Sequence, residues 1–174
     1  MTKYKKGTKI KSRSPKGYIY ELSEPVGRNF HPDFKPELTP KEMLELGVFG
    51  GLYFREDKKE FPDSWFEKAK LQPKGVEESN KELNYFKVNA SQSLKVWQEK
   101  GWIYRNDPHG WFQWYARYYL GRRLGDGEDE RQIKRWKNMK RHASQIINNC
   151  TKGDLICRKK QRQALLHWAY DGRR

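Results

Sequence analysis

Residues 107–123 read DPHGWFQWYARYYLGRR, and six of their side chains are aromatic. Asp107 followed by Pro108 is a helix-start signal, because the carboxylate can cap free amides and proline suits the first helical turn. The spacing predicts a helix that runs to about Leu120 or Arg123. Aromatic residues would cover most of its circumference, which is typical of a helix that the core of a domain surrounds.

An exposed ring in this helix would have a different role. Trp111 could stack on a base in a groove lined by arginines, as aromatic residues do in single-strand binders and base-flipping enzymes. The arginines available for such a groove are Arg117, Arg122 and Arg123. Both roles stay open, since a core of rings can expose one ring at a cleft.

Capping residues predict helices elsewhere in the chain. Thr39-Pro40-Lys41-Glu42 combines an N-cap, a proline at the first helical position and a capping-box glutamate, which predicts a helix over 40–46. Similar signals predict helices from Asp63 or Ser64 to just before Pro73, from Asn89 to Gly101, over 127–149 and over 155–170. The sequence therefore predicts a mainly α fold, with a single compact domain of about five to six helices over 18–174.

The N-terminal segment has a different character. Residues 18–22 are rich in strand formers and predict a short strand, or a strand pair, near the N-terminus. Residues 1–17 hold seven basic residues and no acidic one, include Gly7 and Pro15, and lack an apolar stripe. This composition predicts a disordered, flexible basic arm.

Charge is segregated along the chain. Residues 1–17 carry +7, residues 131–174 carry 13 basic against two acidic residues, and the stretch between them carries −3, within a net charge of +15. A surface made only for solubility intersperses its signs, whereas clustered positive charge suits a polyanion, most often the phosphate backbone of a nucleic acid.

The helices predicted over 127–149 and 155–170 form a basic C-terminal pair. One face of the first mixes cations that can neutralise phosphates with amides that can read base edges, namely Lys134, Lys137, Asn138, Arg141 and Gln145. The second adds Arg158, Lys159, Lys160 and Arg162, with no acidic residue within 155–170. We therefore expect a protein that binds nucleic acid, either DNA or RNA. A merely solvated basic face is the alternative.

An enzyme that acts on nucleic acid, by base excision or strand hydrolysis, is a second hypothesis. His31 and Asp33 lie in a proline-rich loop, and Asp107 and His109 lie at a helix start, so each pair combines an imidazole with a carboxylate. If the two loops met, one carboxylate could activate water. Loop hydrogen bonds and helix capping explain the same residues without catalysis. A third hypothesis is a protein-interaction module whose basic face meets an acidic partner.

The cysteines and histidines near the C-terminus do not resemble a metal site. His142, Cys150, Cys157 and His167 are spaced more widely than the knuckles of small zinc domains. We therefore expect no metal and no other cofactor, and two reduced cysteines that pack as small apolar residues.

Composition limits the class of protein. Hydrophobic residues make up 35% of the chain and aromatic residues 14%, which predicts a folded body. No run of about 18 apolar residues and no signal-peptide pattern is present. We expect a soluble intracellular protein, cytoplasmic or nuclear and not secreted, with no membrane partner.

Overall fold

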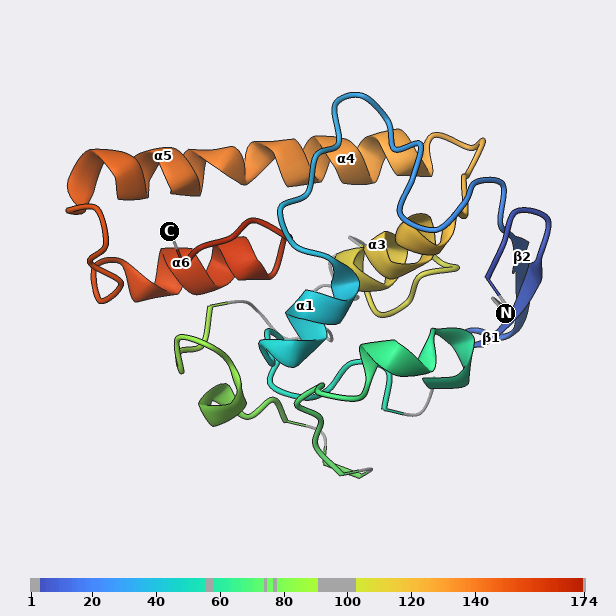
Figure 1. Ribbon diagram of the computed structural model, residues 1–174, viewed down its shortest axis with the longest axis horizontal. Coiled ribbons are helices and arrows are strands. Elements are labelled where there is room, and N and C mark those ends of the chain that lie inside the picture. Colours follow the sequence, from blue (N-terminus) through green and yellow to red (C-terminus); the bar gives the residue numbers. More distant parts are fainter. Residues whose placement is uncertain (1–3, 56–57, 74, 77, 91–102, 174) are drawn as a thin grey trace. The chain divides into compact units, whose positions relative to one another are not determined.

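The computed structural model describes residues 4–55, 58–73, 75–76, 78–90 and 103–173. The chain divides into two compact units, and each unit joins segments that are far apart in the sequence (Figure 1). Unit 1 consists of Met1–Lys35, Asp57–Pro62 and Gln92–Lys134, and unit 2 of Pro36–Glu56, Asp63–Ser91 and Arg135–Arg174. The expectation of a single domain over 18–174 stays a prediction.

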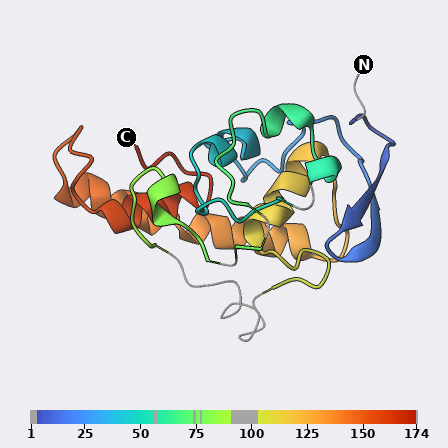
Figure 2. The same cartoon turned by 90° about the horizontal axis from the view of Figure 1, so that it is seen from below.

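A two-stranded antiparallel hairpin begins unit 1. Strand β1, Lys9–Arg13, pairs with strand β2, Lys16–Glu21. Ile10 lies opposite Tyr20 in the ladder, and both side chains are buried. Figure 2 shows the two strands side by side. The expected strand near residues 18–22 is confirmed.

The hairpin corrects the expectation of a flexible arm over residues 1–17. Lys9–Arg13 is a strand in which exposed and buried residues alternate. The buried residues are Ile10 and Ser12. Because alternate residues of a strand point to the same face, this short alternation is enough to pack one side of β1 on the rest of unit 1.

Helix α3, Trp111–Leu120, supplies much of the core of unit 1. All of its side chains are buried except that of Tyr119, which is half-buried. The ring of Phe34 packs against the rings of Trp111, Trp114, Tyr115 and Tyr118, with centroids 5.5 to 6.3 Å apart. The expected aromatic core helix is confirmed. It begins after Gly110 rather than at Pro108, and its N-cap position makes no side-chain hydrogen bond.

The chain leaves α3 through a close backbone contact. Gly121 has a φ of 125°, a conformation that favours glycine. Its carbonyl oxygen accepts hydrogen bonds from the N–H groups of Ser23 and Glu24. Leu22 and Arg122 form an isolated β-bridge beside it. These bonds attach the segment that follows β2 to the end of α3.

Unit 2 contains α1, Pro40–Glu45, whose start matches the prediction. The hydroxyl of Thr39 accepts from the N–H of Glu42 at 3.1 Å, and the Glu42 carboxylate accepts from the N–H of Thr39 at 3.2 Å. This reciprocal pair is the capping box that the sequence predicts.

The other predicted helices of the middle region are shorter or lie outside the described residues. A single 3₁₀ turn, η2 at Asp63–Trp65, replaces the helix expected to end before Pro73. Two more 3₁₀ turns are η1, Lys58–Glu60, in unit 1 and η3, Lys81–Leu83, in unit 2. Most of the helix predicted from Asn89 to Gly101 lies outside the described residues.

The C-terminal region is helical. The helix predicted over 127–149 is divided at Met139 into α4, Glu128–Asn138, and α5, Lys140–Asn149. Helix α6, Lys159–Leu166, packs against α5 within unit 2 (Figure 1). It begins later than expected, because Arg158 before it has a left-handed backbone with φ of 55°.

Buried rings and one buried amide organise the core of unit 2. The rings of Trp136 and Tyr170 stack with centroids 4.9 Å apart. The side chain of Gln163 donates to the carbonyl of Val48 and accepts from the N–H of Phe86. The expectation of a mainly α fold is thus confirmed in part, since a hairpin, 3₁₀ turns and long irregular segments accompany the helices.

Candidate nucleic-acid interface

Two arginines expected to bind nucleic acid lie inside unit 1. Arg117 and Arg122 are 0% and 1% exposed. Arg122 forms two hydrogen bonds with Asp107, and Arg117 donates to Asp107 and to Glu60 at 2.8 Å each. Contrary to the expectation, neither arginine is available to nucleic acid, because two buried carboxylates neutralise both charges.

The same network attaches the hairpin to α3. Arg117 donates from Nη2 to the hydroxyl of Ser12 at 2.6 Å and to the carbonyl of Ser14 at 2.9 Å. The hydroxyl of Tyr20 donates to Glu60 at 2.6 Å. Burial alone would lower the pKa of Arg117, but hydrogen bonds and the charges of Glu60 and Asp107 raise it. The guanidinium is therefore a permanent charge that holds the β1–β2 turn.

Trp111 and Arg123 are also engaged within unit 1. Trp111 is 4% exposed, and its indole N–H donates to the carbonyl of Gln132 at 3.2 Å. Arg123 is half-buried, with its guanidinium 3.6 Å from the centre of the Tyr118 ring. It also donates to the carbonyl groups of Tyr118 and Arg122. Trp111 therefore offers no stacking surface for a base.

The candidate catalytic pairs have different surroundings. His31 and Asp33 are exposed, and the N–H of Asp33 donates to Nδ1 of His31 at 3.1 Å. Asp107 is fully buried against two arginines, so it cannot act as a base toward a molecule in solvent. His109 is half-buried, and its backbone N–H donates to the side chain of Gln113 at 2.9 Å. The Asp107–His109 pair therefore has no carboxylate that a molecule in solvent can reach.

The two cysteines form a disulfide, which corrects the expectation of reduced thiols. Cys150 is the C-cap residue just after α5, Cys157 precedes α6, and their Cα atoms are 5.9 Å apart. Sulfur atoms joined in this way do not act as thiolate ligands. The described part of the chain also has no cluster of three or more potential metal-binding side chains. Among the same residues, no helix has the length and apolar character that crossing a membrane requires.

The polar face expected on the long helix is exposed. It carries the side chains of Lys134 and Lys137 on α4, of Asn138 at its end, and of Arg141 and Gln145 on α5. The opposite face holds buried Trp136 and Ile146. The face that the sequence assigned to nucleic acid is therefore the solvent-facing one.

Hydrogen bonds join the polar faces of α5 and α6 within unit 2. The side-chain amide of Gln161 lies 3.2 Å from Nδ1 of His142 and donates to the side-chain oxygen of Gln145. Arg158 donates to the other end of the same Gln161 side chain at 2.9 Å. Burial, followed by the positive charge of Arg141, lowers the pKa of His142. We use the name α5–α6 seam for four exposed residues, namely Arg141 and Gln145 on α5, Arg158 just before α6 and Lys159 at the start of α6.

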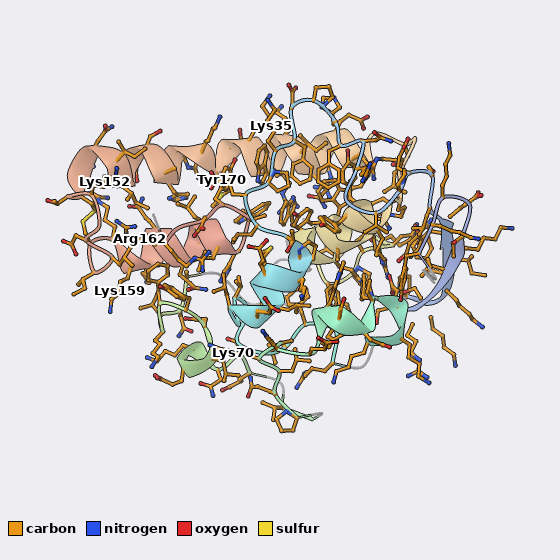
Figure 3. The ribbon with its side chains drawn as sticks, in the orientation of Figure 1. Lys35, Lys70, Lys152, Lys159, Arg162 and Tyr170 are labelled. Carbon is orange, nitrogen blue, oxygen red and sulfur yellow. A yellow bond between two sulfur atoms is a disulfide. The ribbon has the colours of Figure 1, made fainter. Side chains whose placement is uncertain are left out.

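Among the basic residues predicted on the last helix, Arg162 has a different role. Arg158, Lys159 and Lys160 are exposed, whereas Arg162 is 1% exposed. It donates to the carbonyl groups of Asp154, Cys157 and Gly172 at 2.7 to 3.0 Å. Figure 3 labels Lys152 and Lys159 near the turn between the helices and Arg162 further along α6. Contrary to the expectation, Arg162 builds this turn and does not face solvent.

The sequence predicted the positive charge of residues 1–17, but it did not predict that part of this charge lies on an ordered strand pair. The exposed residues of the hairpin include Lys9, Lys11, Arg13 and Lys16. Their alternation with Ile10 and Ser12 is a period-two signal that could have revealed an ordered strand.

Comparison with known proteins gives no match: no family model, no curated protein and no solved structure is similar to this chain.

Proposed function

We propose that the protein binds nucleic acid through the exposed cations of its C-terminal helices, with the α5–α6 seam as the centre of contact. The observation that carries the proposal is a group of positive charges that no salt bridge neutralises. Arg141, Arg158, Lys159 and Lys160 are exposed, and none of them forms a salt bridge with another described residue. Clustered cations of this kind neutralise phosphates and release counterions.

The acidic residues of this region support the same reading. Residues 135–174 contain two acids, Asp154 and Asp171. Asp154 accepts from the N–H groups of Ile156 and Cys157, and Asp171 pairs with Arg173 at 2.8 Å. Both carboxylates therefore have local partners, and the positive charge of the seam stays available to an external anion.

Amide side chains beside the cations favour nucleic acid over an acidic protein partner. Asn138 and Gln145 are exposed on the same helical face as Arg141. The oxygen of the Gln145 side chain already accepts from Gln161, so Asn138 is the amide with both groups open to a base edge. Amides can form paired hydrogen bonds with base edges, which an acidic polypeptide does not present. The enzyme hypothesis lacks comparable support, because Asp107 is neutralised in the core.

Removal of seam charge tests the proposal. The variant R141Q/R158Q/K159Q should bind DNA and RNA more weakly and should flatten the slope of log affinity against log salt by up to about three units, roughly one per lost phosphate contact. Fluorescence anisotropy of labelled oligonucleotides at several salt concentrations measures both quantities.

A matched control separates the seam from total charge. The variant K35Q/K68Q/K81Q removes the same charge from exposed positions elsewhere and should keep the parental salt slope. Equal losses in the two variants would contradict a localised site. Binding of polyglutamate as tightly as DNA would favour the acidic-partner hypothesis instead.

A further inference from the structure

The hairpin presents a basic face that the helical interface does not include. Exposed side chains on the strands are those of Lys9, Lys11 and Arg13 on β1 and of Lys16, Ile19 and Glu21 on β2. The opposite side of the ribbon is buried through Ile10, Ser12 and Tyr20. The ribbon therefore turns four cations, one aliphatic residue and one acid toward solvent.

The ribbon is held in place from inside unit 1. The turn carbonyl of Ser14 accepts from Arg117 at 2.9 Å and from the Gln113 side chain at 3.0 Å. Ser12 accepts from Arg117, and Tyr20 donates to Glu60, as described above. A surface fixed in advance loses little conformational entropy when it binds, so its cations are preorganised for a ligand.

The strand register places like charges together. Lys11 lies opposite the exposed Ile19, and, after an irregularity in the register between Lys11 and Arg13, Arg13 lies opposite Lys16. Only Lys9 faces an acid, Glu21. Like charges directly opposite each other in a sheet are destabilising. An anion bound over the Arg13–Lys16 pair would remove this repulsion, which makes the register itself an argument for an anionic partner.

We propose that the exposed face of the β1–β2 ribbon is a second binding site, and that its ligand is duplex DNA. This inference rests on the proposed function only in requiring a nucleic-acid partner. The major groove of B-form DNA is wide enough for a two-stranded β-ribbon, whereas the major groove of A-form RNA is deep and narrow. Lysine and arginine side chains would contact phosphates and guanine edges, and Ile19 would contact a thymine methyl group.

The same face is unsuited to single strands. Proteins that bind single strands stack bases on exposed aromatic rings. On the ribbon, Tyr20 is buried and Tyr18 is half-buried, with its hydroxyl accepting from Arg122 at 3.2 Å. The outward residues thus supply charge on a rigid frame, which matches a stiff duplex better than a flexible strand.

The test compares three probes: a DNA duplex, an RNA duplex of the same sequence, and one separated DNA strand. The full-length variant K9Q/K11Q/R13Q should lose at least about tenfold affinity for the DNA duplex, with a smaller salt slope. Its affinity for the RNA duplex and the single strand should change less than threefold. The control K35Q/K68Q/K81Q should change the affinity for each of the three probes only by the amount that the lower net charge causes. Circular dichroism and thermal unfolding should match the parent, because the three side chains are exposed.

The possible outcomes show which of the two proposals fails. If the parent binds no nucleic acid, the proposed function and this inference both fall. If the seam variant loses affinity but the ribbon variant matches the control, the helical interface stands and the ribbon site is overturned. Equal losses on all three probes would show a phosphate contact that does not recognise the duplex, which would overturn the assignment to duplex DNA.

Discussion

Arg122 and Asp107 face each other through two hydrogen bonds, with Nη1 2.8 Å from Oδ1 and Nη2 2.6 Å from Oδ2. The same Oδ1 atom accepts from Arg117 at 2.8 Å. One buried carboxylate therefore serves two arginines, and Glu60 balances the second positive charge. The stability of unit 1 should depend on this arrangement, because an unpaired buried charge is far more costly than a paired one.

Replacement of Asp107 should destabilise the protein strongly. Asp107→Asn keeps the shape but removes the charge that both arginines share, so the free energy of unfolding should fall by about 3–5 kcal/mol. Urea unfolding followed by tryptophan fluorescence measures the change. Asp63→Asn, at an exposed position, is the control and should change stability by less than about 0.5 kcal/mol. If the Asp107 variant is as stable as the wild type, Asp107 does not neutralise the two arginines as described.

Gly121 and Gly125 are four positions apart in the sequence, and they should differ in their tolerance of alanine. At Gly121 a Cβ would lie 2.0 Å from the carbonyl oxygen of Glu24, and φ is 125°. At Gly125 nothing lies within 4 Å of a Cβ. Gly121→Ala should therefore lower the thermal midpoint by several degrees or prevent folding, at a cost of at least about 1–3 kcal/mol. Gly125→Ala should leave the midpoint within about 2 °C of the parent. Similar midpoints for both variants would argue against the contact between Gly121 and Glu24.

Reduction of the Cys150–Cys157 disulfide should destabilise the helix pair of unit 2. The bond closes a short loop with a sequence separation of seven, and the loop-entropy relation gives a stabilisation of about 2–3 kcal/mol. The midpoint of urea unfolding should shift downward when dithiothreitol is added. The variant C150S/C157S should already be shifted and should not respond to dithiothreitol. If dithiothreitol shifts the midpoint of this variant as much as that of the parent, the reductant does not act through this disulfide.

His167 should make stability depend on pH. Burial lowers the pKa of His167 from 6.5 to about 4, and Nε2 has no hydrogen-bond partner among the described residues. The unfolded state therefore binds more protons than the folded state between these values, so stability should decrease as the pH falls from about 6.5 to about 4. The loss attributable to this group is at most about 3 kcal/mol.

The variant His167→Gln isolates this effect. It retains the other histidines, including His142, whose pKa is also lowered, so the difference between variant and parent reports on residue 167. Its unfolding free energy should vary less with pH over this range. Parallel pH profiles for variant and parent would contradict the buried neutral imidazole.

Part of this structure follows from local signals. The capping box of Thr39 and Glu42 joins residues three positions apart, so the sequence alone predicts α1. The aromatic spacing of α3 predicts a core helix in the same way, because periodicity is a property of neighbouring residues. The exposed cations of the C-terminal helices were predictable for the same reason, as one face of a helix repeats every three to four residues.

Local signals were insufficient where the role of a residue depends on distant partners. Asp107 precedes a proline and resembles an N-cap, but its carboxylate forms salt bridges with two buried arginines. Arg162 lies among exposed lysines in sequence, yet three carbonyl groups of a turn and of the C-terminal segment surround it. The disulfide likewise required α5 and α6 to pack against each other.

Local sequence sets where charge and aromatic residues concentrate, and it is enough to predict helices whose hydrogen bonds join near neighbours. Which charges are buried and which are exposed depends on contacts between distant parts of the chain. Ser12 and Arg117 are 105 positions apart, and Tyr20 and Glu60 are 40 apart, so no short window of sequence contains both members of either pair. A buried charge is stable only beside its partner, and the partner is chosen by the packing of the whole unit.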